Sequence, residues 1–135
     1  EGLAVAPGAP RGAGDEVGGE REDRDRAEDQ PELTEVQHRL MFVQALEAVR
    51  ALEQGVLTDI REGDVGAILG WGFAPWTGGP FGWLDMLGAE RVVELADKLA
   101  AEHGDRFAPP ALVRDMAAKG ESFYGRFGPQ AKQAA

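Results

Sequence analysis

The sequence contains no cysteine and no asparagine, a single serine and tyrosine, and only two histidines. Without cysteine there is no disulfide, no thiolate zinc site and no cysteine nucleophile, and such a chain suits a reducing compartment, so we expect a cytoplasmic protein. Basic residues are also scarce, since 14 Lys and Arg stand against 24 Asp and Glu for a formal net charge of −10. Nucleic acids and anionic membranes are bound through clustered basic residues, so we expect neither as a partner.

Long apolar runs are missing as well. No run approaches the roughly 20 residues that cross a bilayer, and the first residues lack the basic start and apolar centre of a signal peptide. With 135 residues, the chain has room for one modest core and a tail. It begins with Glu1 instead of Met, which suggests an excised fragment, a processed product or an incomplete reading frame.

The first 30 residues, EGLAVAPGAPRGAGDEVGGEREDRDRAEDQ, mix Gly, Pro and Ala with charges and contain no large apolar side chain after Val17. Such a composition does not offset the entropy cost of ordering the chain. We therefore predict a flexible, acidic, Gly/Pro-rich linker or tail over 1–30, a helical domain over 31–128 and a disordered C-terminal tail over 129–135.

From Pro31 onward, apolar residues recur every three or four positions, which predicts an amphipathic helix over about 31–54 that Gly55 ends. Its apolar positions are Leu33, Val36, Leu40, Val43, Leu46 and Val49. Asp59 followed by Glu62 has the spacing of a capping box and predicts a second, short helix that ends at Gly70. The apolar residues of that helix are Ile60, Val65, Ile68 and Leu69.

The remaining pattern predicts three more helical segments. An apolar turn with Trp83, Leu84, Met86 and Leu87 is closed by Gly88, a helix led by Glu90 stops at Gly104, and a last helix lies between Pro109–Pro110 and Gly120. No segment has the pattern of a β-strand. We therefore expect an all-α fold, a single domain of about five helices without internal repeats.

The stretch GWGFAPWTGGPFGWLDMLG, residues 70–88, combines many glycines with all three tryptophans. Its first part lacks the third glycine of a dinucleotide fingerprint and follows a helix instead of a strand, and no Walker Gly-Lys-Ser/Thr follows, so we do not expect it to bind phosphate. We interpret Gly78 and Gly79 as a sharp turn or a close approach of two helices. The aromatic residues would fill the space between helices, the alternative being a surface that packs on another domain; they are Trp71, Phe73, Trp76, Phe81 and Trp83.

Side chains for catalysis are few. Ser122 lies just past a predicted helix end, where a hydroxyl commonly bonds the backbone. His38 is expected on a helix surface, and His103 at the negative end of a helix dipole. The two histidines lack metal-ligand spacing, and no calcium-loop pattern is formed by Asp59, Glu62 and Asp64. The residues alone therefore predict no active site.

Three segments, HRLMFVQALEAVRALEQGV, DIREGDVGAILGWGFAPWTGGPFGWLDMLG and LVRDMAAKGESFY, in this order resemble one family. It is the second half of the C-terminal 3-hydroxyacyl-CoA dehydrogenase domain of multifunctional fatty-acid oxidation proteins, and the resemblance covers about His38 to Tyr124. The most specific motif is G-x-G-F-x-P-x-x-G-G-P with a following aromatic residue and Asp-x-x-Gly. It is carried by Gly70, Gly72, Phe73, Pro75, Gly78, Gly79, Pro80, Trp83, Asp85 and Gly88, while Ala74 stands where many relatives have proline.

The resemblance implies NAD-linked oxidation of an L-3-hydroxyacyl-CoA to the 3-ketoacyl-CoA in fatty-acid β-oxidation. The family's catalytic His–Glu pair, Ser and Asn match no position of this chain. The resemblance therefore assigns the chain no catalytic, cofactor-binding or metal-binding residue. It implies that NAD is bound by the parent enzyme and not by this chain.

The implied role is structural: this domain braces the active-site half, as the partner subunit does in single-function relatives. Its implied partners are the Rossmann domain and the first helical half of the dehydrogenase, in cis or in trans. The isolated chain is then expected to be inactive. A free-standing helical protein-interaction module is the alternative.

Overall fold

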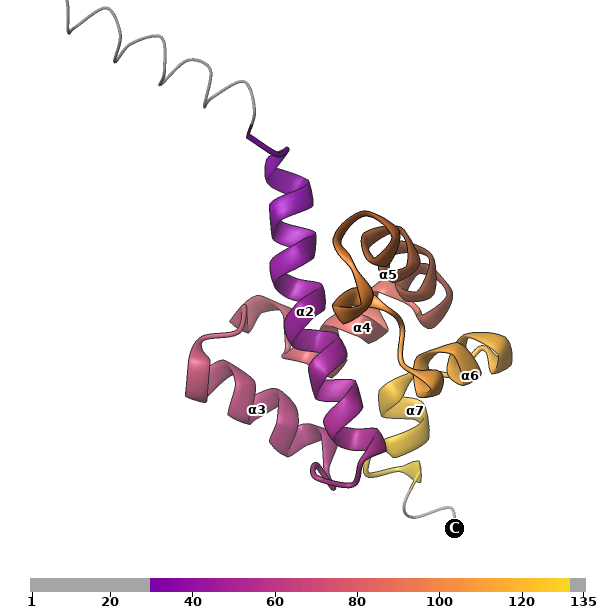
Figure 1. Cartoon of the computed structure of the whole chain (residues 1–135). Coiled ribbons are helices and arrows are strands. Elements are labelled where there is room, and N and C mark those ends of the chain that lie inside the picture. Colours follow the sequence, from indigo (N-terminus) through magenta and orange to yellow (C-terminus); the bar gives the residue numbers. More distant parts are fainter. Residues whose placement is uncertain (1–29, 132–135) are drawn as a thin grey trace, which may run out of the picture. The chain divides into compact units, whose positions relative to one another are not determined.

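In the computed structural model, residues 30–131 are described, and this part of the chain folds entirely into helices and turns (Figure 1). The predicted all-α fold is confirmed. The expected tail over 1–30 lies outside the described residues except for Gln30, as do residues 132–135 of the expected C-terminal tail. Of the described residues, 34–131 belong to one compact unit, and 30–33 do not belong to it.

Among the described residues there are six α-helices and two short 3-10 helices, η1 (Pro75–Thr77) and η2 (Asp105–Phe107). The α-helices are α2 (Leu33–Glu53), α3 (Ile60–Trp71), α4 (Pro80–Leu87), α5 (Ala89–His103), α6 (Ala111–Lys119) and α7 (Phe123–Phe127). The estimate of about five helices missed α7. Its five residues are too few to show helical periodicity, and they are ordered by contacts with distant residues.

Helix α2 is buried only in its second half. Its fully buried residues are Phe42, Ala45, Leu46 and Val49, on one face. Leu33 and Leu40, which the periodicity placed on the apolar face, are 70% and 58% exposed. The expectation was wrong for these two residues because periodicity defines a face of a helix but not how far along the helix a partner covers that face.

The boundaries of α3 differ from the prediction at one end. Asp59 caps its N-terminus as expected, and its carboxylate accepts a hydrogen bond from Arg61 N at 3.0 Å. At the other end, the helix continues through Gly70 to Trp71, and the left-handed residue that ends it is Gly72, with φ of 75°. The prediction that Gly70 ends this helix was wrong, because either glycine can adopt that conformation and the sequence does not choose between them.

Glycines end α2, α4, α5 and α6 where the sequence placed them. Gly55, Gly88, Gly104 and Gly120 all have positive φ, and each follows the last turn of a helix. Of the residues expected in the apolar turn that became α4, Leu84 is buried, whereas Met86 is 72% exposed.

Helix α4 lies at the centre of the unit, in contact with α3, α5 and α7, while α5 packs on α6 and η2 (Figure 1). The side chain of Arg50 on α2 donates to the carbonyl oxygens of Arg106 and Ala108, both at 3.1 Å, and so ties the η2 segment to α2. The core consists of Phe42, Ala45, Leu46, Val49, Ile60, Phe81, Leu84, Val92, Ala96, Leu99, Phe107, Val113, Met116 and Phe123.

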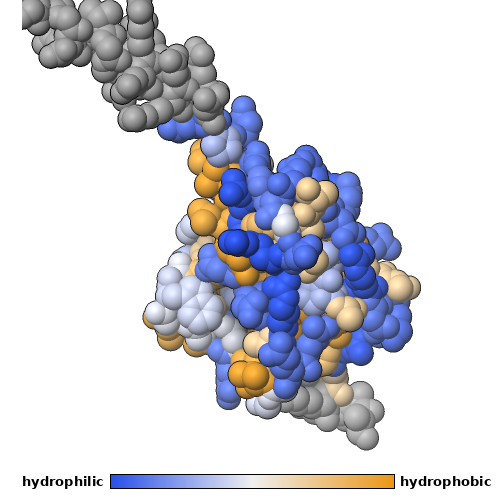
Figure 2. All heavy atoms as spheres, viewed as in Figure 1, coloured by the Kyte–Doolittle hydropathy of each residue, from blue (hydrophilic) through white to orange (hydrophobic). Residues whose placement is uncertain are grey.

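The face shown in Figure 2 is largely hydrophilic, as the excess of acidic residues leads one to expect. Among the helices of residues 30–131, none combines the length and the apolar character that crossing a membrane requires.

Candidate functional site

Two glycine turns, each followed by a proline, connect α3 to α4. Gly72 and Gly78 lie in the left-handed region, with φ of 75° and 79°, and Gly79 has φ of 109° and ψ of 179°. Pro75 and Pro80 are the first residues of η1 and α4, where a helix needs no N–H donor. The turns redirect the backbone between two helices that pack on each other.

Gly79 and Gly78 serve different purposes. A Cβ atom on Gly79 would lie 2.5 Å from the Cβ and 2.6 Å from the Cα of Asp64 on α3. A Cβ atom on Gly78 would meet nothing within 4 Å. Gly79 therefore permits the close approach of the turn to α3, whereas Gly78 is required only for its backbone conformation.

The carboxylate of Asp64 caps the N-terminus of α4. Phe81 N donates to its Oδ1 at 2.7 Å and Gly82 N to its Oδ2 at 3.1 Å, and Asp64 is only 2% exposed. The turn before it is closed by Thr77, whose hydroxyl donates to Ala74 O at 2.6 Å and accepts from Gly79 N at 3.2 Å. Asp64 thus satisfies N–H groups that the first turn of a helix leaves without a partner.

A third helix joins the same site. The hydroxyl of Tyr124 on α7 donates to Asp64 Oδ2 at 2.7 Å. Asp85 on α4 accepts from Phe123 N at 2.6 Å and from Tyr124 N at 2.9 Å, so it caps α7. We call Asp64, Asp85 and Tyr124 the carboxylate network; it connects α3, α4 and α7.

The side chains of the network are bonded to one another or to backbone N–H groups. Burial raises the pKa of Asp64, although hydrogen bonds from Tyr124, Phe81 and Gly82 act in the opposite direction. Burial, and then the bond to Asp64, raise the pKa of Tyr124 above its ordinary value of 10. The phenol therefore stays protonated as a donor, and the carboxylate accepts three hydrogen bonds, which is the arrangement of a structural group.

The loop also does not fit the phosphates of a dinucleotide. The N–H groups that could face a phosphate at the start of α4 are those of Phe81 and Gly82, and both are bonded to Asp64. Gly78 N donates to Pro75 O and Phe73 N to Ala67 O within the loop. A phosphate at this helix end would displace, or lie beside, a buried carboxylate of like charge. The N–H groups of this turn are thus already bonded within the protein.

The aromatic residues of this segment divide into two groups. Phe73 and Phe81 are buried, and Trp83 is half-buried, with its ring 5.0 Å from that of Phe42 in an edge contact. Trp71 and Trp76, however, are 63% and 82% exposed. The expectation that all five fill the space between helices was wrong for these two, because no element of the described residues covers most of Trp71, at the end of α3, or Trp76, in η1.

Beside Trp76 lies a recess of about 330 Å³, lined by Gln37, His38, Met41, Trp76, Thr77, Trp83 and Leu87. Trp71 lies against the same helix α2, where its Nε1 donates to Gln44 Oε1 at 3.1 Å. Both exposed tryptophans therefore border α2.

The candidate catalytic side chains take part in helix caps and contacts. Ser122 caps α7 by accepting from Gly125 N at 3.0 Å. His38 is half-buried on α2, with its ring 6.3 Å from that of Phe42. His103 lies in the last turn of α5. The three side chains contact different partners, and among the described residues none of them is hydrogen-bonded to another.

His103 does meet two carboxylates. Its Nε2 lies 2.9 Å from Glu35 Oε1 on α2 and 3.9 Å from Glu102 Oε2. Donor atoms of the three side chains lie within 4.8 Å of one another, the geometry of a possible metal ligand set. Because all three are partly exposed and His103 already bonds to Glu35, we interpret the group as a hydrogen-bonded contact between α2 and α5.

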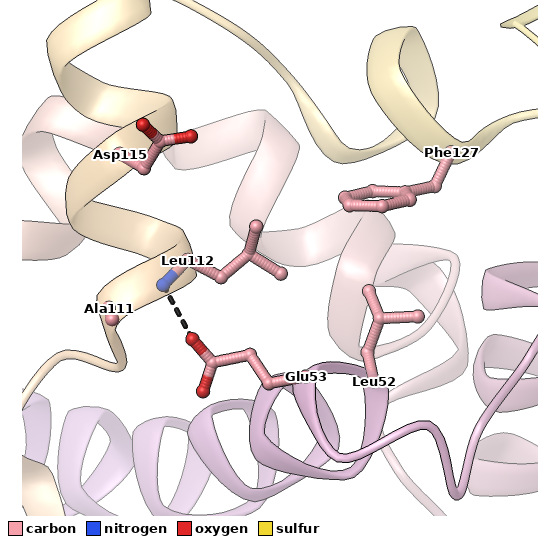
Figure 3. A pocket seen from close by; sticks show the side chains of 6 residues that line it. All are labelled: Leu52, Glu53, Ala111, Leu112, Asp115 and Phe127. Atoms are coloured by element: carbon pink, nitrogen blue, oxygen red, sulfur yellow. Dashed lines mark hydrogen bonds between the residues drawn. The ribbon is translucent and has the colours of Figure 1, made fainter.

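A second groove lies between α2, α6 and α7 (Figure 3). Leu52, Leu112 and Phe127 point toward one another across it, and Glu53 Oε1 accepts from Leu112 N at 2.5 Å. Glu53 thereby caps the N-terminus of α6, so the polar group at this groove is also used for helix packing.

Sequence reasoning missed Asp64 and Tyr124 as members of the site. One signal was available for Asp64: it lies four residues after Ile60 and three before Ala67, which are both buried on α3. An acidic residue within an apolar stripe needs a buried hydrogen-bonding partner. Tyr124 carried no such signal, because its partner is 60 residues away.

Comparisons with known proteins agree on one group. Residues 36–126 match the family described as the 3-hydroxyacyl-CoA dehydrogenase, C-terminal domain. The chain is also similar to the fatty acid oxidation complex subunit alpha of Shewanella amazonensis, with 47% identity over 93 residues. The matched region is 69% of this chain but 13% of that protein, so the chain spans a small part of the relative's length.

Proposed function

The chain belongs to the 3-hydroxyacyl-CoA dehydrogenase C-terminal domain family, and from this we propose that it is the second helical half of a dehydrogenase that serves fatty-acid β-oxidation. In the parent enzyme, an L-3-hydroxyacyl-CoA is oxidised to the 3-ketoacyl-CoA with NAD as the acceptor. This second helical half braces the half that carries the active site, and this second half contributes no catalytic residue. Its partners are the NAD-binding Rossmann domain and the first helical half.

The carboxylate network is the observation that carries this proposal. Asp85, which belongs to the family motif, and Asp64, which lies on α3 before it, both cap helices. Tyr124 is committed to Asp64. Among the described residues, every buried polar side-chain atom has a hydrogen-bond partner. Such a site fixes the relative positions of α3, α4 and α7 and leaves no group for acid–base chemistry.

Two assays test the proposal. NADH fluorescence is titrated with the isolated chain, and oxidation of a 3-hydroxyacyl-CoA is followed by NADH absorbance, with the full-length relative as the positive control. We expect neither saturable binding nor turnover from the isolated chain. Saturable micromolar binding of NADH, or turnover by the chain alone, would overturn the structural role.

A replacement experiment tests the family role directly. Residues 36–126 of this chain are substituted for the matching segment of the full-length relative, to which the chain is 47% identical. We expect this chimera to keep dehydrogenase activity, because the exchanged segment carries structural and not catalytic residues. A chimera that folds but has lost turnover contradicts the assignment.

Exposure of Trp71 and Trp76 supports a second candidate, a free-standing module that binds another protein. The coding sequence upstream distinguishes the two. A strand–Gly-x-Gly-x-x-Gly–helix unit in the same reading frame supports the dehydrogenase, whereas a frame without any such unit supports the free-standing module.

A further inference from the structure

We propose that a surface on α2 and around the two exposed tryptophans docks an apolar helix from another domain of the parent chain. We call it the tryptophan surface; it consists of Gln37, Leu40, Met41, Gln44, Trp71 and Trp76. The inference rests on the proposed function, because it specifies where the bracing contact is made.

The four residues of α2 lie on one face of the helix. Their spacing of i, i+3, i+4 and i+7 brings them into a continuous stripe. Trp71 borders the stripe through its hydrogen bond to Gln44, whose Nε2 in turn donates to Leu40 O at 2.8 Å. Trp76 borders it through the recess that it shares with Gln37 and Met41. Two large aromatic side chains thus flank one uncharged helix face.

Charge is absent from this surface although the chain is strongly acidic. Residues 65–84 contain no Asp, Glu, Lys or Arg, and the four α2 residues are also uncharged. The same stretch contributes Val65, Leu69, Trp71 and Trp76 to the exposed large hydrophobic residues. Centres of protein interfaces are depleted in charge and enriched in tryptophan, and monomer surfaces rarely present such a group.

The shape of the surface favours a helix as the occupant. A stripe with a recess of about 330 Å³ beside it suits an amphipathic helix that inserts an apolar side chain between Trp76 and α2. Two copies of this chain would each bring a formal charge of −10, and this repulsion opposes a dimer.

The length of the relative favours an occupant in cis. The relative devotes 13% of its length to the region matched here, so most of that chain consists of other segments. Another domain in the same chain is present at a high effective concentration and needs little affinity of its own.

Hydroxyl-radical footprinting with mass spectrometry tests the inference. Oxidation rates of Trp71 and Trp76 are compared between the isolated chain and the chimera described above. We expect the rates of both tryptophans to fall by about tenfold in the chimera, because the centre of an interface excludes water. Met86 and Val56 are 72% and 78% exposed and lie outside the tryptophan surface, so their rates should stay the same and serve as the internal control.

A variant pair adds an independent measurement. Changing Trp71→Gln together with Trp76→Gln should leave the thermal midpoint of the isolated chain within about 3 °C, since both residues are exposed. In the chimera, the same change should lower dehydrogenase activity by about fivefold or more, as loss of interface anchors does. The matched control changes Val56→Gln together with Met86→Gln and should leave that activity unchanged.

The outcomes separate the inference from the proposed function. An active chimera in which both tryptophans remain as reactive as in the isolated chain overturns the docking inference and leaves the proposed function intact. An inactive but folded chimera contradicts the proposed function. If the isolated chain dimerises by light scattering and its tryptophans become protected as its concentration rises, the occupant is a second copy and the inference is overturned.

Discussion

At the scale of single residues, the contact between Gly79 and Asp64 determines how closely the turn before α4 approaches α3. The backbone of Gly79 has a conformation available essentially to glycine alone, with φ of 109° and ψ of 179°. The same residue faces the Cα and Cβ atoms of Asp64, which are parts of α3 that cannot move aside without moving the helix. Conformation and packing therefore require glycine at one position.

Gly79→Ala and Gly78→Ala should separate these two requirements. We expect Gly78→Ala to lower the free energy of unfolding by about 1–2 kcal/mol, the cost of a left-handed residue with a Cβ atom. Gly79→Ala adds overlap with Asp64 and should cost more than about 3 kcal/mol or prevent folding. Urea denaturation followed by circular dichroism measures both. Equal losses for the two variants would contradict the close approach of Gly79 to α3.

At the scale of elements, α7 is an example of a helix that its own sequence cannot hold. Its five residues are far fewer than the roughly 12 that an isolated helix needs. Its N-terminal N–H groups are bonded to Asp85 and Ser122, and Phe123 is inserted beside Phe81, with their ring centres 5.2 Å apart. Helix α7 therefore depends on α4 for both its cap and its packing.

Asp85→Ala should release α7 while leaving the other helices in place. Two N–H groups lose their acceptor, and we expect the free energy of unfolding to fall by about 1–3 kcal/mol. Hydrogen exchange should show faster exchange at Phe123 and Tyr124 but not along α5. Asp97→Ala is the control, because it removes an exposed ion pair with Arg114 and should cost less than about 1 kcal/mol. Unchanged protection of α7 in Asp85→Ala would show that the cap is not what holds it.

At the scale of the whole molecule, the carboxylate network couples the stability of the domain to alkaline pH. Tyr124 has a raised pKa in the folded state, so its phenol keeps a proton that the unfolded chain releases above about pH 10. The folded state then binds more protons than the unfolded state, and stability falls as the pH rises. The contribution of this phenol is complete below pH 10 and is lost toward its folded-state pKa.

Tyr124 is the only tyrosine, so its ionisation can be observed directly by tyrosinate absorbance. We expect the folded chain to titrate above the ordinary range of tyrosine and to lose stability as the pH rises above about 10. Tyr124→Phe should lower stability at neutral pH by about 1 kcal/mol, through loss of the bond to Asp64, and should weaken the alkaline dependence. A tyrosinate transition at the ordinary pKa of 10, with native circular dichroism throughout, would contradict the raised pKa.

Local chemistry explains why much of the fold was accessible from the sequence. Helices end at Gly55, Gly88, Gly104 and Gly120, each of which has positive φ. Such a glycine ends a helix through hydrogen bonds within the last turn, so its effect does not depend on distant residues. The N-cap at Asp59 is equally local. The motif over residues 70–88 indicated the family, because such a long combination of specific residues rarely arises by chance.

Only the tertiary structure decided how the side chains of that motif are used. Apolar character is the same for Phe81 and Trp76, yet Phe81 is fully buried and Trp76 is 82% exposed, because burial depends on which element lies opposite. In the sequence, Asp64 is one acidic residue among many. In the structure, it accepts hydrogen bonds from α4 and α7, whose donors lie 17 and 60 positions away in the chain. The sequence by itself determined five of the six α-helices of the described residues and the family. The packing of distant helices decided that Asp64 connects them and that Trp71 and Trp76 face outward, because contacts between remote segments follow from global packing and leave no periodic trace along the chain.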